Sequence, residues 1–210
     1  MKRFIIIALS FLITINLIAC SQNKKKIEFQ KHYDLGIQYQ SEEKYEDALL
    51  AFNEALEIDP KSPDVYIGLA ETYLCLGEYD KALDTIEQAS LSCNDYENYE
   101  DKTTDFDDIK KEAKWNVSYE NGIKCKSNED YDNAIIAFEK SIEIDEKNQN
   151  SYLALADTYL QLEDYDSALE AISKGREACG NMTNFDVLED TIIEVMPKPS
   201  EGLEYVSNND

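Results

Sequence analysis

Histidine, glycine, proline and basic residues are all scarce in this chain, and each scarcity excludes a class of protein. Among 210 residues there is a single histidine, His32. A cluster of histidine metal ligands is therefore excluded, and a Ser–His–Asp triad would have to use that one residue. With 7 glycines and 4 prolines, the chain has too few turn residues for a loop-rich β-sandwich. The 20 basic residues face 44 acidic ones, and a net charge of −24 argues against binding to nucleic acid phosphates.

The residues that are abundant predict a folded helical protein without catalytic machinery. Hydrophobic residues make up 43% of the chain and aromatic residues 10%, which is too apolar for a disordered chain. No glycine-rich phosphate loop occurs, and the acidic run 95–108 lacks the glycine of a calcium-binding loop. We therefore expect no enzymatic activity, no cofactor, no metal site and no small-molecule substrate.

The N-terminus carries the pattern of a targeting segment. After Met1-Lys2-Arg3, the stretch 4–19 is almost wholly apolar, and as a helix it reaches about 24 Å, short of the roughly 30 Å bilayer core. The run ends in Leu17-Ile18-Ala19-Cys20, which resembles the bacterial lipobox. The resemblance implies a signal peptide over 1–19, lipid attachment at Cys20 and a tether over 20–28.

Two other interpretations of this N-terminal stretch stay open. One is an uncleaved membrane anchor, and the other is ordinary secretion with a free cysteine. Three lysines over 24–26 follow directly, and they either contact anionic lipid head groups or serve as a solvated tether.

One short motif, Tyr-x-x-Ala, occurs four times at regular spacing. Its alanines lie 34 residues apart within each of two pairs and 52 residues apart between the pairs, and they are Ala48, Ala82, Ala134 and Ala168. A period of this length is the signature of a repeat architecture. The second pair is a copy of the first at an offset of 86 residues.

The 34-residue unit resembles the tetratricopeptide repeat (TPR), a helix–turn–helix module. The repeats span 29–62, 63–96, 115–148 and 149–182. Repeat 1 carries the fullest pattern, with His32, Leu35, Gly36, Tyr39, Ala48, Phe52, Ala55 and Pro60. Repeat 3 is the weakest, because Ser118, Asn121, Cys125, Ser141 and Glu146 stand at pattern positions. The resemblance implies an all-α solenoid of four repeats in two pairs, in which the first helix of each repeat is helix A and the second is helix B.

Helical periodicity supports this fold independently of the resemblance. In repeat 2, Tyr66, Leu69, Ala70 and Tyr73 fall on one helical face. Small residues at the pattern positions of both helices let helices A and B approach closely, and they are Gly36, Ala70, Gly122, Ala156 and the four motif alanines. A single hairpin cannot cover its apolar face, so the hairpins are expected to stack.

Two segments lie outside the repeats. The acidic insertion 97–114 contains a helix-start pattern, and we expect helix A of repeat 3 to begin near Asp105 and to run long. The segment 183–197 predicts a capping helix, with Phe185, Leu188, Ile192 and Val195 as its apolar stripe. The tail 198–210 is expected to be mobile.

The resemblance places a partner-binding groove along the A helices. Carried over by position, its residues are Gln30, Tyr33, Ile37, Gln40, Asp64, Ile67, Glu71, Leu74, Asn116, Tyr119, Ile123, Asn150, Leu153, Asp157 and Leu160. Aromatic residues beside acids suit an apolar or basic peptide segment. The basic clamp with which some family members hold a peptide carboxylate is missing. The alternative is that Tyr33 and Tyr119 pack between repeats and that the acids only keep the surface soluble.

Four cysteines remain besides Cys20. The pattern Cys-x-x-Cys does not occur, so no zinc site is expected, and we interpret these cysteines as small apolar residues. Cys75 and Cys125 fall near the ends of adjacent A helices, which leaves a disulfide between them open. Cys93 and Cys179 occupy the same repeat position in separate pairs and are expected to be too far apart to bond.

The sequence as a whole predicts a membrane-anchored, extracytoplasmic TPR lipoprotein of a bacterial cell. It would act as a protein–protein interaction scaffold that binds a protein or peptide partner in its groove. The alternative is a structural subunit of a cell-envelope assembly complex, held through its convex face or its capping helix. An enzyme or a small-solute receptor would need an enclosed polar pocket, and no residue set indicates one.

Overall fold

The computed structural model describes residues 2–96 and 99–197, and within them it contains helices and turns but no strand. The predicted tail 198–210 and the side chains of residues 1–20, with Cys20 among them, lie outside the described part. The α-helices are α1 (Lys2–Ser41), α2 (Tyr45–Ile58), α3 (Pro63–Cys75), α4 (Tyr79–Ser92), α5 (Thr103–Ser127), α6 (Tyr131–Ile144), α7 (Gln149–Gln161), α8 (Tyr165–Cys179) and α9 (Thr183–Val195). A short 3₁₀-helix, Glu100–Lys102, precedes α5. The predicted all-α fold of paired helices is confirmed.

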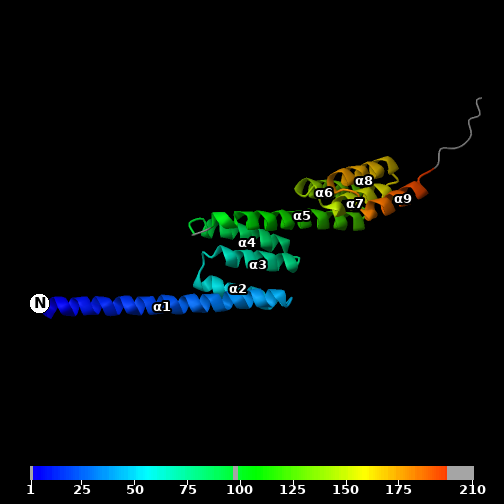
Figure 1. Ribbon diagram of the computed structural model, residues 1–210. Coiled ribbons are helices and arrows are strands. Elements are labelled where there is room, and N and C mark those ends of the chain that lie inside the picture. The colour runs from blue at the N-terminus through cyan, green and yellow to red at the C-terminus, as the bar shows by residue number, and fades with distance from the viewer. Residues whose placement is uncertain (1, 97–98, 198–210) are drawn as a thin grey trace, which may run out of the picture. The chain divides into compact units, whose positions relative to one another are not determined.

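The chain forms two compact units, 1–114 and 115–210. In the first unit, helices α1 to α4 lie side by side in sequence order (Figure 1), and each helix packs on the next. The first half of α5 joins this unit through Phe106 and Ile109, which pack with Tyr66, Ile86 and Cys93. The insertion therefore supplies the last helical face of the first pair of repeats.

The second unit repeats this plan with one added helix. The second half of α5 packs on α6, where Tyr119 contacts Phe138. Helix α7 follows against α6 and α8. Helix α9 then covers α7 and α8, and Phe185 and Ile192 are fully buried. The predicted capping helix is thus present, although Val195 of the expected apolar stripe is 52% exposed because the buried face of α9 is narrow.

Glycines and alanines stand where helices come closest, as the repeat pattern predicts. All eight predicted small positions are buried, and Ala48, Ala82, Ala134 and Ala168 are fully so. A Cβ added to Gly36 would lie 2.5 Å from the ring of Phe52, and one added to Gly68 would lie 2.6 Å from the same ring. The Phe52 ring is therefore held between the backbones of α1 and α3, an arrangement that only glycine permits on both sides.

The turns between helices A and B share one backbone conformation. Each contains a residue with a φ between 58° and 72°, at Glu43, Gly77, Glu129 and Glu163. The chain then closes with a hydrogen bond from the next N–H to a carbonyl five residues back, as from Lys44 to Tyr39 at 2.9 Å. These four positions are equivalent in the repeat, yet only one of them carries glycine, the residue for which a positive φ has no steric cost.

Two helices are longer than a repeat requires. Helix α5 begins at Thr103, near the predicted Asp105, and has 25 residues, so the expected long helix A of repeat 3 is confirmed. Helix α1 extends from repeat 1 back to Lys2, and the predicted tether 20–28 lies inside it. Of the residues that the structure describes, no helix combines the length and hydropathy that a membrane span requires.

Candidate partner-binding groove

The predicted groove of the first unit is built around Tyr33 of α1. Its ring stacks on Phe29 with centroids 6.2 Å apart and meets the Phe52 ring at 6.0 Å, so one side of Tyr33 belongs to the core. Burial raises the pKa of the Tyr33 hydroxyl, and the nearby carboxylates of Asp64 and Glu71 raise it further. The structure therefore brings α1 and α3 residues of the predicted groove together around this hydroxyl.

The acids of this groove are partly neutralised. The Asp64 carboxylate pairs with Lys102 at 2.9 Å, and this lysine comes from the 3₁₀-helix of the insertion. The Glu71 carboxylate accepts a hydrogen bond from the Gln40 amide at 3.4 Å. Because that amide is uncharged, this hydrogen bond does not neutralise the Glu71 carboxylate.

The predicted groove residues of the second unit have the same arrangement of aromatic rings, but their charges differ. Tyr119 stacks on Trp115 with centroids 4.8 Å apart and meets the Phe138 ring at 5.7 Å. The Asp157 carboxylate pairs with Lys126 at 2.6 Å. Gln40 and Lys126 are equivalent positions, and each links its A helix to the next. The second groove is therefore less acidic than its sequence indicates.

The remaining groove residues divide between surface and core. Ile37 and Ile123, which are equivalent, are 42% and 37% exposed and present apolar surface. The half-buried aliphatic side chains are Ile67, Leu74, Leu153 and Leu160, each of which packs against a core cluster. Gln30 donates a hydrogen bond to Asp34 along α1, Asn150 lies exposed in the first turn of α7, and Asn116 is half-buried. Tyr33 and Tyr119 are half-buried and meet core phenylalanine rings, and their role in binding a partner stays a prediction.

Sequence reasoning missed three contributors to the groove. Phe29 and Trp115 stack beneath the two tyrosines, and their common repeat position was the available signal, because both are aromatic. Lys102 had no such signal, since it belongs to the insertion and its partner Asp64 lies 38 residues away.

Trp115 also anchors a buried polar chain that is specific to the second unit. Its Nε1–H donates to the Ser151 hydroxyl at 2.9 Å, and the Ser141 and Ser151 hydroxyl oxygens are 2.8 Å apart. Both serines are fully buried. In the first unit the three equivalent residues are the apolar Phe29, Ala55 and Val65. Hydrogen bonding thus explains why repeat 3 departs from the family pattern at Ser141.

Cys75, Cys93, Cys125 and Cys179 are all free thiols, so the disulfide left open between Cys75 and Cys125 is not formed. Cys93 is fully buried, and burial raises the pKa of its thiol to about 11, so it packs as a small apolar residue. His32 lies largely buried with Nδ1 2.7 Å from Oε2 of Glu54. Within the described residues no group of acidic, histidine or cysteine side chains has the arrangement of a metal site.

Comparisons with known proteins identify the repeats. The family model "Tetratricopeptide repeat" matches residues 39–101, and the model "Anaphase-promoting complex, cyclosome, subunit 3" matches residues 127–194. Superkiller protein 3 of Schizosaccharomyces pombe is 26% identical over 172 residues, which are 78% of this chain. The chain spans only 11% of that protein's length.

Solved structures of repeat proteins are also similar. One, described as a functional characterization of Pseudomonas aeruginosa PilF, is 21% identical, with a TM-score of 0.44, over 82% of this chain and 86% of that one. Another, the hetero-tetramer Cut9–Hcn1 of the APC/C, is 19% identical, with a TM-score of 0.40, over 82% of this chain and 40% of that one.

The repeat period, the paired helices and the family match agree. Stacked helical repeats of this kind expose an extended surface along one set of helices, which suits macromolecular partners. The chain contains tetratricopeptide repeats, and these support a protein–protein interaction scaffold.

Proposed function

We propose that this protein is a lipid-anchored scaffold that binds an apolar or basic peptide segment of a partner protein along its A helices. The observation that carries the proposal is the equivalent placement of Tyr33 with Ile37 and of Tyr119 with Ile123. Each tyrosine is half-buried, and each isoleucine is exposed one helical turn further along the same helix. Exposed apolar side chains next to half-buried aromatics are the usual anchors of an interface.

The charges of the first unit favour a partner segment that carries basic residues. The Glu71 carboxylate has an uncharged partner, Gln40, whereas Asp64 and Asp157 are paired with lysines. A basic segment that meets Glu71 gains attraction without displacing a resident lysine. The protein's own net charge of −24 adds long-range steering, which salt weakens.

The anchoring part of the proposal rests on the lipobox-like end of the N-terminal apolar run. Lipid attached to Cys20 would hold the scaffold on the extracytoplasmic face of a bacterial membrane, and the protein would do no chemistry itself. Variant Cys20→Ser is then expected to move from the membrane fraction to the soluble fraction, and to lack the mass of a lipid adduct. Retention in the membrane would instead support an uncleaved anchor.

A pair of double variants tests the groove against the rest of the surface. Ile37→Ser with Ile123→Ser removes apolar anchors from the A helices α1 and α5. Leu50→Ser with Ile136→Ser is the matched control, because these equivalent residues are 62% and 61% exposed on the B helices α2 and α6. Partners recovered with the wild-type protein from native membranes are quantified by mass spectrometry for each variant, and helix content is checked by circular dichroism.

The proposal predicts loss of partner recovery for the first double variant and full recovery for the control. The reverse result would contradict the groove and favour the alternative, a structural subunit of an envelope complex held through its other face or its capping helix. One observation favours that alternative. Helix α9 leaves Val187, Ile193 and Val195 more than half exposed, which is unusual apolar surface for a terminal helix.

A further inference from the structure

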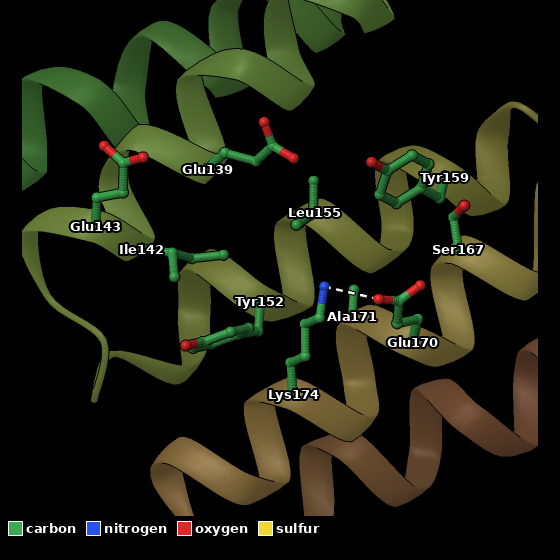
Figure 2. Close-up of a pocket in the computed structure, with 10 residues that line it drawn as sticks. All are labelled: Glu139, Ile142, Glu143, Tyr152, Leu155, Tyr159, Ser167, Glu170, Ala171 and Lys174. Carbon is green, nitrogen blue, oxygen red and sulfur yellow. Dashed lines mark ion pairs between the residues drawn. The ribbon is translucent and has the colours of Figure 1, made fainter.

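The second unit contains a depression on the face of α7 opposite to the groove. It has a volume of about 530 Å³. Its lining comes from α6, α7 and α8, and Figure 2 shows these side chains around the opening. The residues that matter for its chemistry are Tyr152, Tyr159, Glu139, Glu170, Lys174 and Ser167.

Charges in this depression favour a cation. Three glutamates line it against one lysine, and that lysine, Lys174, is already paired with Glu170 at 2.7 Å (Figure 2). Burial raises the pKa of the Tyr159 hydroxyl, and the Glu139 carboxylate raises it further. The carboxylate of Glu139 is therefore close enough to the Tyr159 hydroxyl to influence it. The Glu139 carboxylate also attracts the Lys174 ammonium, so three carboxylates share a single ammonium around the Tyr159 ring.

In the first unit the equivalent tyrosine ring has a cation as its partner. There Lys81 places its ammonium 5.5 Å from the ring centroid of Tyr73, where a cation is attracted by the face of the ring. Tyr73 and Lys81 are the equivalents of Tyr159 and Ser167. In the second unit Ser167, a short uncharged side chain, stands in place of this lysine. The cation that remains near Tyr159 is Lys174, which pairs with Glu170.

We propose that this depression binds an arginine side chain of a partner protein, with its guanidinium against the Tyr159 ring and its N–H groups directed to Glu139. A planar guanidinium stacks on an aromatic ring and bonds to a carboxylate at the same time, which an ammonium does less well. The site is separate from the predicted groove, because neither Leu153 nor Asp157 of α7 is among the residues that line it. A partner that occupies both would hold the second unit from two faces.

Short peptides test the site directly. The probe is acetyl-Gly-Gly-Arg-Gly-Gly-amide, and the comparison peptide replaces arginine with citrulline, which has the same shape without the charge. Binding is followed by the shifts of backbone amide signals in a titration of the full chain by nuclear magnetic resonance. We expect shifts in α6, α7 and α8, and a dissociation constant about tenfold higher for the citrulline peptide.

Two variant pairs separate the depression from the general acidity of the protein. Ser167→Lys restores the residue of the first unit and is expected to weaken arginine binding about tenfold, because the new ammonium occupies the ring face. Ser173→Lys is its control, since it adds the same charge to an exposed position of α8 outside the lining. Glu139→Gln is expected to weaken binding, and its control Glu194→Gln, on the exposed side of α9, to leave binding within about twofold.

Equal binding of the two peptides would overturn the proposal, as would equal weakening by Ser167→Lys and Ser173→Lys. Shifts confined to α1 and α3 would place the peptide in the groove and would also overturn it. The groove variant Ile37→Ser with Ile123→Ser is expected to leave arginine binding unchanged, so failure of one site is distinguishable from failure of the other.

Discussion

Ser151 shows how a single buried hydroxyl distinguishes two copies of one module. It accepts from Trp115 and contacts Ser141, whereas the first unit has Val65 at the equivalent position. Variant Ser151→Val is expected to lower the free energy of unfolding by about 1–3 kcal/mol, because the indole N–H loses its acceptor. The Ser141 hydroxyl loses one of its two partners and keeps its hydrogen bond to the Phe138 carbonyl. Chemical denaturation followed by Trp115 fluorescence measures this change.

A triple variant provides the matched control. Trp115→Phe with Ser141→Ala and Ser151→Val gives the second unit the three residues of the first. It is expected to be more stable than Ser151→Val alone, since no polar group is then left unpaired. If the triple variant had a lower free energy of unfolding than Ser151→Val, packing of the indole ring rather than hydrogen bonding would dominate at this site.

Gly36 gives a second prediction at the scale of the residue. Alanine favours a helix over glycine by roughly 1 kcal/mol, so a substitution judged by propensity alone would stabilise the protein. Its Cβ would however lie 2.5 Å from the Phe52 ring, and overpacking of this kind costs about 1–3 kcal/mol. We expect Gly36→Ala to lower the urea midpoint and Phe52→Leu in the same chain to recover part of the loss. A higher midpoint for Gly36→Ala would show that α1 shifts freely.

The turns between helices A and B allow a prediction at the scale of the element. Glu129 adopts a φ of 60°, a conformation that costs about 1–2 kcal/mol for a residue with a Cβ. Glu129→Gly is expected to raise the melting temperature, while Gly77→Ala at the equivalent position is expected to lower it. Thermal unfolding by circular dichroism measures both, and a fall in both variants would mean that the flexibility of the unfolded chain outweighs the relief of strain.

The capping helix has a pH-sensitive attachment. The Arg176 guanidinium pairs with Asp186 and Glu189 at 2.7 Å each. Its hydrogen bond holds the pKa of Glu189 below the ordinary value of 4.5. A carboxylate with a lowered pKa stabilises the folded state above that value and loses this contribution as the pH falls below it.

Variant Arg176→Gln tests this attachment. It is expected to unfold at lower urea than the wild type near neutral pH. The difference between their urea midpoints should narrow in acid, below the ordinary glutamate pKa of 4.5, as Glu189 becomes protonated. Lys174→Gln, which breaks an exposed pair on the same helix, is the control, and its urea midpoint should differ less from that of the wild type. If the difference in urea midpoint between Arg176→Gln and the wild type stayed constant with pH, the effect would come from packing of the arginine side chain.

Most elements could be predicted because the sequence repeats. The alanines at 48, 82, 134 and 168 set the register of every B helix, and helix α5 begins two residues from its predicted start. The groove was harder to predict because its charges depend on pairs far apart in sequence. Lys102 with Asp64 and Lys126 with Asp157 join different helices, and periodicity shows which residues share a face but not which partner neutralises them.

At the scale of the whole molecule, the two units offer separate probes of unfolding. The only tryptophan, Trp115, lies in the second unit, whereas circular dichroism reports on all helices. Phe52→Ala removes a fully buried ring from the first unit, a change that costs about 3–5 kcal/mol. We expect this variant to shift the circular dichroism transition to lower urea more than the fluorescence transition.

The reverse variant completes the comparison. Phe138→Ala, at the equivalent position of the second unit, is expected to shift the fluorescence transition to lower urea more than the circular dichroism transition. Coincident transitions in both variants would show instead that the chain unfolds as one cooperative block. Stacked repeats permit either behaviour, because their stability depends on the strength of the contacts between neighbours.

The hydroxyl pair in the second unit has a consequence for how a duplicated chain folds correctly. Two copies of one module could exchange helices while they assemble, because α2 and α6 share the pattern Tyr-x-x-Ala-x-x-Ala-Phe. If α2 docked on α7, Ser151 would face Ala55 and would lose the hydrogen bond to Ser141 while it keeps the one from Trp115, a loss of about 0.5–1.5 kcal/mol. We therefore expect the serine pair to favour docking of α6, rather than α2, on α7.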